Sequence, residues 1–399
     1  METISISEYD YLLPDEKIAK YPLDNRELSG LLVYNKGKIT NNTFSDLHQF
    51  IPENSLLVFN NTRVIQARLQ FKKQTGAEIE IFCLEPSEPA DYYQSFQQNQ
   101  TCTWKCLIGN SKKWKEGTIS LLFNKNDLTI ELKAERIADY GEWQQIKFSW
   151  NNSNISFGEI LEIVGKTPIP PYLHRDSENI DKSRYQTIYS LQNGSVAAPT
   201  AGLHFTPAVF ERLENKNIKP CGITLHVGAC TFRPVKEENA ALHVMHTEHF
   251  FVKKDVLEQL LKFENNITAV GTTSMRTLES IYHIGTKIVK KQDNPFFIGQ
   301  WEVYNSDEIS VKQSIESLLN YCITQNCTEI AASTQIMIVP DYKFKMVQRL
   351  ITNFHQPKST LLLLIAAFTG KDKWKGIYNH ALENNYRFLS YGDSSLLIP

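Results

Sequence analysis

Four short stretches of this chain bring together side chains that suit acid–base chemistry and ligand binding. They are PTAGLHFT (199–206), LHVGACTFRPV (225–235), VGTTSMRTLES (270–280) and TNFHQPKSTLLLL (352–364). Each follows or contains a short apolar run and then combines Gly, Thr, Ser, His, Asn or Arg. This composition is typical of strand ends that present polar groups to a ligand. We therefore expect one site, built from several loops of the second half of the chain.

Histidine and glutamate side chains in or beside these stretches are candidates for proton transfer. We predict that His204, His226, His246 and Glu248 supply the general acid and base, because imidazoles titrate near neutral pH. The alternative for any single histidine is a packing role, and the sequence does not assign acid and base individually. His243, His246 and Glu248 form an H-x-x-H-x-E pattern that also permits a metal site.

Two arginines are candidates for binding an anion. Arg63 in NNTRV and Arg276 in TTSMRT carry planar guanidinium groups that suit a carboxylate or a phosphate. Asn60, close to Arg63, could form hydrogen bonds with an amide or hydroxyl group of a ligand. Gly202 and Gly228 would let backbone N–H groups approach a ligand closely. The alternatives are salt bridges that fix loops and ordinary turn glycines.

The elements that must position these groups fall into two kinds. Residues 67–157 contain short β-rich runs separated by turn residues: AEIEIFCLE, CTWKCLIG, GTISLLF, LTIELKAE and EWQQIKFSW. This pattern predicts a small all-β domain, antiparallel and Greek-key-like, that is inserted into the chain. Residues 1–66 and 158–399 would then form one catalytic domain.

Helical and strand-like runs alternate after residue 158. FGEILEIVG, PAVFERLENKN and KKDVLEQLLKFENN have helical patterns, and they alternate with strands such as IKPCGITLHV, ITAVGTT and EIAASTQIMI. Such alternation predicts an α/β fold with a mainly parallel sheet or barrel. Because polar loops follow successive strands, we expect a TIM-like α/β barrel with the polar stretches at its mouth. No G-x-G-x-x-G opens a helix after a strand, so a dinucleotide-binding fold is not indicated.

The composition is that of a globular protein. With 399 residues and 42% apolar content, the chain can bury a large core. Its seven cysteines show no framework spacing, and METISISEYD is not a signal peptide, so we expect a reducing, cytoplasmic setting. The apolar stretches are too short and too interrupted to cross a bilayer. We expect a monomer.

The net charge of −2 does not by itself indicate a nucleic-acid partner. Local lysine runs could still form a basic face, and those at 112–115 and 371–375 also contain tryptophan. Trp114 and Trp374 are therefore candidates for stacking on bases. The alternative is that each run is ordinary solvated surface.

Further motifs lie before, between and after the polar stretches. YDYLLPDEKIAKYPL lies at 9–23 and is followed by NNTRVIQARL and DKSRYQTIYS; HVMHTEHF lies at 243–250 and YRFLSYGDSSLLI at 386–398. Together with the four polar stretches they occur in the order found in one family, from near residue 8 to residue 398. The chain thus resembles, over nearly its whole length, the S-adenosylmethionine:tRNA ribosyltransferase-isomerases of queuosine biosynthesis.

The resemblance implies a fold and a reaction. Members of this family are expected to have a TIM-like barrel with an inserted β domain. They act on tRNA that carries 7-aminomethyl-7-deazaguanine at the wobble position. The ribosyl part of S-adenosylmethionine is transferred to the aminomethyl group and isomerised, which gives epoxyqueuosine-tRNA, adenine and methionine. S-adenosylmethionine is then a co-substrate, and neither a metal nor a separate cofactor is implied.

This reaction also implies roles for the candidate residues. A base is needed for the proton at the 5′ carbon beside the sulfonium, and an acid is needed for the leaving adenine. Arg276 or Arg63 would bind the methionine carboxylate. The full set of expected substrate-binding residues is Asn60, Arg63, Thr200, Gly202, Gly228, Thr231, Thr272, Thr273, Ser274, Arg276, Asn353, His355, Ser359, Thr360, Tyr391 and Asp393.

Four positions depart from the pattern that the family resemblance implies. Gly30 stands where an arginine is usual, Cys230 where a glycine is usual, and Ser394-Ser395 where alanine and methionine are usual. One alternative is therefore a catalytically weakened paralog that binds tRNA or a nucleoside. A second alternative is a metal-dependent barrel hydrolase that uses His243, His246 and Glu248.

Overall fold

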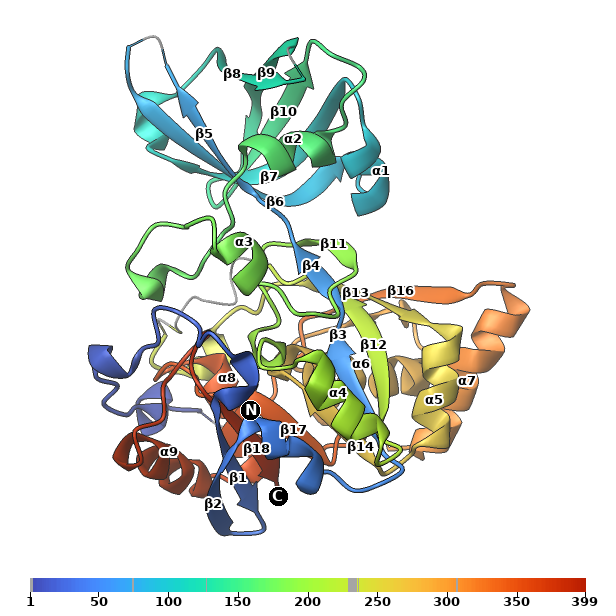
Figure 1. Ribbon diagram of the computed structural model, residues 1–399. Helices are drawn as coiled ribbons and strands as arrows, with labels where there is room; N and C mark the ends of the chain where they lie inside the picture. Colours follow the sequence, from blue (N-terminus) through green and yellow to red (C-terminus); the bar gives the residue numbers. More distant parts are fainter. Residues whose placement is uncertain (1–2, 74, 127, 229–234, 236, 306–307) are drawn as a thin grey trace.

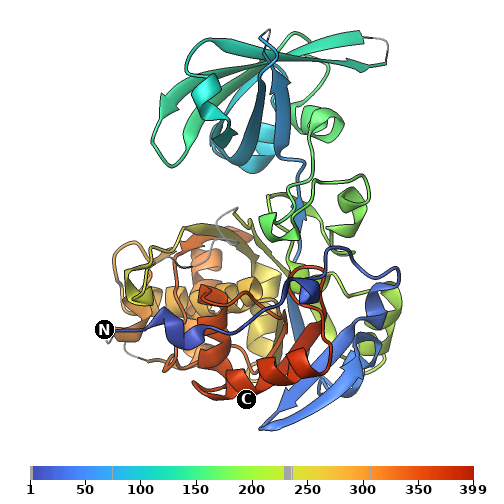
Figure 2. The same ribbon diagram turned by 90° about the vertical axis from the view of Figure 1, so that its left-hand side faces the viewer.

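The computed structural model describes residues 3–73, 75–126, 128–228, 235, 237–305 and 308–399. Its strands form a large sheet, a smaller sheet and a two-stranded ribbon. Figures 1 and 2 show the smaller sheet standing above the larger body and joined to it by a narrow connection. The ribbon, β4 (Thr62–Val64) with β11 (Gln192–Ser195), lies at this connection.

The large sheet has ten strands and mixes parallel with antiparallel neighbours. In spatial order these are β15 (Phe297–Ile298), β16 (Glu329–Thr334), β13 (Glu248–Lys253), β12 (Lys219–Leu225), β3 (Leu56–Asn60), β14 (Ile267–Val270), β17 (Arg349–Asn353), β18 (Ser394–Ile398), β1 (Gly30–Asn35) and β2 (Lys38–Thr43). The central strands β12, β3, β14 and β17 are parallel, so their carboxyl ends share one edge. Because β13 and β18 run the opposite way, they begin at this same edge.

Helices cover both faces of the central strands. Two helices, α1 (Tyr92–Gln97) and α2 (Phe157–Val164), pack on the smaller sheet. The other helices are α3 (Asp181–Arg184), α4 (Pro207–Glu214), α5 (Lys254–Lys262), α6 (Thr272–Val289), α7 (Val311–Thr324), α8 (Thr360–Thr369) and α9 (Lys373–Glu383). Leu56 and Val58 of β3 face a core that contains Met275 of α6. Their neighbour Phe59 points to the other face, where it joins a core with Val209 of α4.

The predicted α/β class is confirmed, whereas the TIM-like barrel is not. The sheet is mixed, and no pairing among the described residues joins its outer strands β15 and β2. The expectation of a barrel rested on polar loops that follow successive strands. Parallel strands in an open sheet place their carboxyl ends at one edge as well, so this sequence pattern does not distinguish the two architectures.

The smaller sheet is antiparallel and lies within the expected insertion. In spatial order its strands are β5 (Arg68–Lys72), β6 (Glu78–Glu88), β7 (Thr101–Gly109), β10 (Gln144–Trp150), β9 (Leu128–Asp139) and β8 (Thr118–Lys125). β7 lies beside β10, the last of three consecutively paired strands, which is the Greek-key order. β5 and β8 also contact each other, so the sheet is nearly closed. Its core is separate and contains Trp104, Phe148 and Phe157. An inserted domain with boundaries at 67 and 157 stays a prediction.

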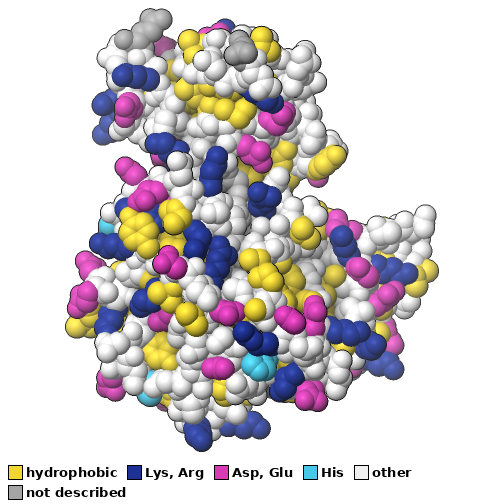
Figure 3. All heavy atoms as spheres, in the orientation of Figure 1, with side chains coloured by type: hydrophobic (Ala, Val, Ile, Leu, Met, Phe, Trp, Pro, Cys, Tyr) yellow, Lys and Arg dark blue, Asp and Glu magenta, His cyan; other side chains and the backbone are white. Residues whose placement is uncertain are grey.

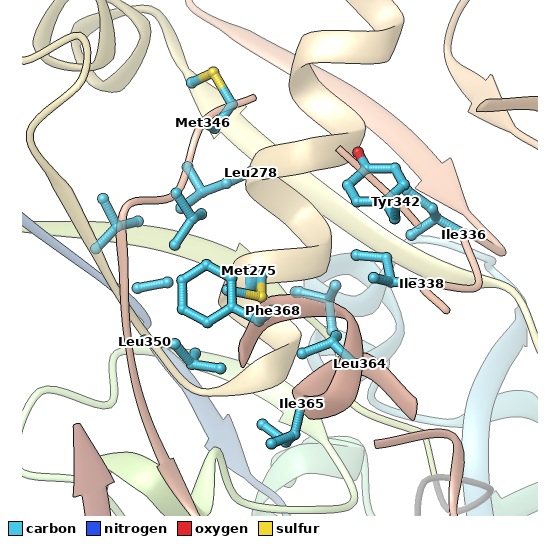
Figure 4. Packing of buried hydrophobic residues seen from close by; sticks show 14 of the residues in the cluster. Met275, Leu278, Ile336, Ile338, Tyr342, Met346, Leu350, Leu364, Ile365 and Phe368 are labelled. Atoms are coloured by element: carbon cyan, nitrogen blue, oxygen red, sulfur yellow. The ribbon is translucent and has the colours of Figure 1, made fainter. Parts of the chain in front are cut away.

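Helices α6 and α8 contribute side chains to the same part of the main core. Met275 and Leu278 of α6 lie beside Leu364, Ile365 and Phe368 of α8 (Figure 4). Each such side chain stabilises the fold by about 1.5–3 kcal/mol when it is fully buried. This packing fixes the two helices relative to each other, and therefore it also fixes their amino-terminal ends.

The two tryptophans that were candidates for stacking on bases are buried instead. Trp114 lies in the core of the smaller sheet, with the Arg136 guanidinium 5.2 Å from its ring. Trp374 packs against Tyr9 and Tyr378. Both rings are therefore core residues, and neither is available to a nucleic acid.

Within the described part of the chain, no helix has the length and apolar character that a membrane span requires.

Candidate functional site

A pocket opens at the shared edge of the central strands. Open α/β sheets bind ligands at this place, beyond the carboxyl ends of parallel strands. The pocket encloses about 740 Å³, counting its open mouth, and we call it the edge pocket. It is lined by Tyr172, Ala197, Ala198, Pro199, Thr200, Ala201, Val227, Gly271, Thr272, Thr273, Thr352, Asn353, Phe354, His355, Gln356, Ser359, Leu361, Leu389 and Ser390. All four polar stretches contribute to this lining, as a single site requires.

The amino-terminal ends of α6 and α8 both reach the edge pocket. Gly271 precedes α6 with φ of +89°, a conformation that favours glycine, and Thr272 and Thr273 form the first turn of the helix. Ser359 caps α8, where its hydroxyl accepts a hydrogen bond from the N–H of Leu362. Free backbone N–H groups and the helix dipole favour an anion at such ends. The pocket therefore suits a ligand that carries a carboxylate or a phosphate.

Asn353 lies in the wall of the pocket at the end of β17. Its side-chain oxygen accepts a hydrogen bond from the Thr200 hydroxyl at 2.8 Å. Its amide nitrogen lies 3.4 Å from Nε2 of His204 and 3.5 Å from the backbone oxygen of Asp393. These contacts join the PTAGLHFT and TNFHQPKST motifs to the start of β18.

Three of the histidines are buried and a fourth, His355, is partly buried, and all four favour the neutral form. Burial lowers the pKa of His204, His226 and His283 to about 4 and that of His355 to about 3, from a usual 6.5. His355 lines the edge pocket, and its Nε2 lies 2.9 Å from the Thr352 hydroxyl. His204 lies behind the pocket wall. At neutral pH both rings are therefore neutral hydrogen-bonding groups.

We expect these histidines to make the protein sensitive to acid. The unfolded chain binds more protons than the folded chain between about pH 6.5 and pH 4, so the free energy of unfolding falls as the pH falls through this window. His204 alone should account for about 3 kcal/mol. Urea unfolding at pH 7.5, 6 and 5 measures the slope, which His204→Gln should reduce and the exposed control His174→Gln should not. An unchanged slope in the His204 variant would contradict the assignment.

A buried carboxylate is held between an arginine and a histidine beside the pocket. Glu248, the first residue of β13, is fully buried, and its Oε2 lies 2.6 Å from a guanidinium nitrogen of Arg276. Its Oε1 lies 3.4 Å from Nε2 of His246. Burial raises the pKa of the Glu248 carboxyl, but Arg276 and His246 lower it by more, so the pKa stays below its usual value. The ionised carboxylate can then hold a proton on Nε2 of His246, which leaves Nδ1 free to accept another proton.

His246 stands close to the pocket wall. A methyl group placed on Gly228 would lie 3.8 Å from Cδ2 of His246, and Gly228 directly follows Val227 of the lining. About a quarter of the His246 side chain is exposed. The ring is therefore accessible to a ligand, whereas the carboxylate behind it is not.

The geometry does not support a metal at the H-x-x-H-x-E pattern. His243 pairs with Glu237 at 3.1 Å, and His246 pairs with Glu248. Throughout the described ranges, no three His, Cys, Asp or Glu side chains lie close enough together to ligate one ion.

Arg276 does not lie on a loop as expected, because α6 begins at Thr272. The arginine occupies the second turn, where it is buried, pairs with Glu248 and donates a hydrogen bond to the backbone oxygen of Ile336 at 3.1 Å. Ser274 likewise points inward and donates to the oxygen of Val270. Both side chains support the floor of the site and do not line it.

Other expected binding residues have structural contacts instead. The Asn60 side chain bonds to the backbone of Leu225 and Thr62, and the Tyr391 hydroxyl donates to Asp181 at 2.8 Å. A methyl group on Gly202 would collide with the Tyr189 hydroxyl. Thr360 begins α8 but does not line the pocket, and the Asp393 carboxylate bonds to the N–H of Gly30 and to Arg387. Thr231 and Cys230 lie outside the described residues.

Arg63 and His226 lie near the connection between the two sheets. The His226 ring packs against Tyr92 of α1 in a tilted arrangement, with ring centroids 4.1 Å apart. Arg63 is exposed and lines a second cleft, the joint cleft, together with Lys182 and Asn193. Figure 3 shows Lys and Arg side chains gathered along the waist between the smaller sheet and the body. Arg63, which was expected to share a ligand with the four polar stretches, therefore lies outside the edge pocket.

Several lining residues were missed from the sequence. Tyr172 contributes a hydroxyl that hydrogen-bonds with the Ser390 hydroxyl at the pocket. Burial raises the pKa of Tyr172, so this hydroxyl stays protonated at neutral pH. Gln356 lies within TNFHQPKST and could have been selected by its place in that motif. For Tyr172 and Ser390, polarity was the one property in the sequence that pointed to a binding role.

The structure accommodates the departures from the family pattern that it describes. A side chain on Gly30 would start 2.9 Å from the Tyr386 ring, so Tyr386 occupies the space that a larger residue would need. The hydroxyls of Ser394 and Ser395 donate to the backbone oxygen of Thr352. The serines therefore add hydrogen bonds at the β17–β18 pair.

Comparisons with known proteins identify close similarity over the whole chain. Residues 6–397 match the family model described as queuosine biosynthesis protein. An S-adenosylmethionine:tRNA ribosyltransferase-isomerase from Azoarcus sp. (strain BH72) is 36% identical over 99% of this chain and 98% of its own length. A protein of the same name from Syntrophomonas wolfei subsp. wolfei (strain DSM 2245B / Goettingen) is 35% identical, with 98% and 97% covered. The crystal structure of an S-adenosylmethionine tRNA ribosyltransferase from Thermotoga maritima is 26% identical, covers 98% of this chain and 100% of that chain, and has a TM-score of 0.46.

Proposed function

Because this chain belongs to the queuosine biosynthesis family of S-adenosylmethionine:tRNA ribosyltransferase-isomerases, we propose that the edge pocket is where it binds S-adenosylmethionine. The protein is an enzyme that transfers and isomerises the ribosyl group of S-adenosylmethionine in queuosine biosynthesis. Its tRNA substrate carries 7-aminomethyl-7-deazaguanine at the wobble position, and its products are epoxyqueuosine-tRNA, adenine and methionine. The observation that carries the placement is the convergence of all four polar stretches on one pocket.

The methionine carboxylate lies at the amino-terminal ends of α6 and α8. This proposal is supported by the free N–H groups of these first turns and by Thr273, whose side chain lines the pocket. Arg276, the earlier candidate for this role, already has Glu248 as its partner. The carboxylate is then bound by backbone N–H groups and hydroxyls, and the helix dipoles supply the positive field.

His246 acts as the base that removes the proton from the 5′ carbon beside the sulfonium. Its Nε2 faces the Glu248 carboxylate, so Nδ1 is the atom that accepts the proton, and the ion pair stabilises the resulting imidazolium. Tyr172 is a candidate for the acid that protonates the leaving adenine, because its hydroxyl lines the pocket and stays protonated. His204 and His355, whose neutral rings favour hydrogen bonding, are not needed as acids.

The tRNA contacts the joint cleft with its backbone. Arg63 is exposed there and makes no ion pair with any described residue, so its guanidinium is available to a phosphate. Lys182 donates to the backbone oxygen of Glu162 and makes no ion pair within the described part of the chain. These two cations suit tRNA better than they suit the methionine carboxylate, because they do not line the edge pocket.

Incubation with labelled S-adenosylmethionine and tRNA that carries the aminomethyl base tests the function directly. We expect the epoxy-cyclopentanediol nucleoside by mass analysis, together with an equal amount of free adenine. If the protein bound both substrates but formed neither product, it would be the catalytically weakened paralog. A requirement for added metal would instead favour the hydrolase alternative.

Loss of the Thr273 hydroxyl should weaken S-adenosylmethionine binding. Thr273→Val keeps the shape of the side chain but removes one hydrogen bond to a charged group, so we expect roughly 10-fold weaker binding by calorimetry. Thr277→Val is the matched control on the same helix, because its hydroxyl bonds to the backbone oxygen of Thr273 and does not line the pocket. Equal effects of the two substitutions would argue that the helix, and not the pocket, had been disturbed.

A further inference from the structure

The hydrogen-bond contacts of Asn353 determine what it presents to a ligand. Its side-chain amide can donate two hydrogen bonds and accept two. The amide nitrogen faces His204 Nε2 and the backbone oxygen of Asp393, and the amide oxygen accepts from Thr200. Both N–H groups thus have partners, whereas one acceptor position on the oxygen has none among the described residues.

The Asp393 carbonyl fixes the orientation of this amide. A backbone oxygen can only accept a hydrogen bond, so it requires the nitrogen of Asn353 and not the oxygen on that side. The opposite orientation would place two carbonyl oxygens 3.5 Å apart without a hydrogen between them. The Thr200 hydroxyl then donates to the amide oxygen at 2.8 Å.

This orientation in turn fixes the tautomer of His204. Because its Nε2 faces an N–H of Asn353, Nε2 must be the unprotonated acceptor. The ring proton is then on Nδ1, which donates to the hydroxyl of Ser29 at 2.8 Å. Both ring nitrogens are engaged, so His204 has no free atom with which to exchange a proton with a substrate.

The surroundings of His204 keep the ring in this state. The ring is 4% exposed and packs against Phe44, with centroids 5.1 Å apart. The charged groups that face it are the Asp393 carboxylate, which favours the imidazolium, and the guanidinium groups of Arg387 and Arg26, which oppose it. Since Arg387 pairs with Asp393 at 2.9 Å, the carboxylate is largely neutralised and burial decides for the neutral ring.

We propose that His204 is a positioning residue that locks Asn353 as a hydrogen-bond acceptor in the edge pocket, so that Asn353 recognises a donor group of S-adenosylmethionine. The donor is the ammonium of the methionine part, or a hydroxyl or amino group of the adenosine part. This inference rests on the proposed function, because it takes S-adenosylmethionine as the occupant of the pocket. It also removes His204 from the candidates for general acid or base.

Substitution of His204 separates positioning from proton transfer. His204→Ala should weaken S-adenosylmethionine binding by about 10-fold, whereas His204→Gln, whose amide oxygen can accept from Asn353, should recover most of this loss. The turnover number at saturating S-adenosylmethionine should fall by much less than 100-fold in the glutamine variant. His283→Gln is the matched control, because His283 is equally buried but bonds to Tyr342. A loss of turnover above 100-fold with unchanged affinity would overturn the proposal, because a general acid or base behaves in this way.

Two fragments of the co-substrate identify the donor. Asn353→Ala should weaken the binding of S-adenosylmethionine and of only one fragment: methionine if the donor is the ammonium, or adenosine if it is a hydroxyl or amino group. Unchanged binding of all three ligands would overturn the inference while leaving the proposed function intact. The wild-type protein provides the test of the proposed function. If S-adenosylmethionine did not bind to it, or did not compete with methionine or adenosine for binding, the proposed function itself would be wrong.

Discussion

His246→Asn should lower the turnover number by about 10²- to 10⁴-fold, the usual contribution of a general base. The asparagine amide resembles the ring in size but cannot accept a proton at neutral pH. Because Glu248 is buried and already paired with Arg276, the substitution should change the stability of the fold little. Single-turnover kinetics with saturating S-adenosylmethionine and modified tRNA would measure the chemical step without product release.

His243→Asn is the matched control for this prediction. It lies on the same segment, is partly buried and also pairs with a carboxylate, that of Glu237. Its turnover number should stay within a few-fold of the wild type. If both variants were equally inactive, the result would contradict a specific proton-transfer role of His246. It would indicate instead that activity requires the whole segment to be intact.

Arg276→Ala should destabilise the fold by about 3–5 kcal/mol, because it leaves the Glu248 carboxylate buried without its partner. Urea unfolding at pH 7.5 measures this loss. The double variant Arg276→Met with Glu248→Leu should recover much of it, since an apolar pair of similar size carries no unpaired charge. The same double variant should remain nearly inactive, because His246 has then lost the carboxylate that orients it.

A surface arginine provides the comparison. Arg212 on α4 pairs with Glu27 at 3.6 Å and is partly exposed, so Arg212→Ala should cost no more than about 1 kcal/mol. If Arg276 instead bound the methionine carboxylate, as the sequence analysis expects, its loss would weaken S-adenosylmethionine binding by roughly 10- to 150-fold. An Arg276→Ala protein of normal stability that bound S-adenosylmethionine poorly would restore that earlier role.

Local sequence patterns determined much of this protein. Alternating apolar runs with turn residues predicted the antiparallel strands β6 to β10, and polar residues at the ends of β12, β14 and β17 predicted one ligand-binding edge. Both predictions rest on local properties of a short segment, namely the two-residue alternation of a strand and the polar residues at its end. The ordered motifs identified the family, and the comparisons confirmed it.

The partners of individual side chains were decided by the tertiary structure. Gly-Thr-Thr-Ser can begin a loop or a helix, and whether Arg276 meets a ligand or a carboxylate depends on where the β13–β16 pairing places Glu248. His204 appeared catalytic by its motif, yet Asn353, 149 residues away along the chain, occupies its second nitrogen. Likewise, open sheets and barrels place strand ends alike, so only the pairing of distant strands distinguishes them. Burial and ion pairing depend on residues that are distant in the sequence. A short stretch of sequence therefore does not show which residue will pair with its charged side chain, or whether that side chain will be buried.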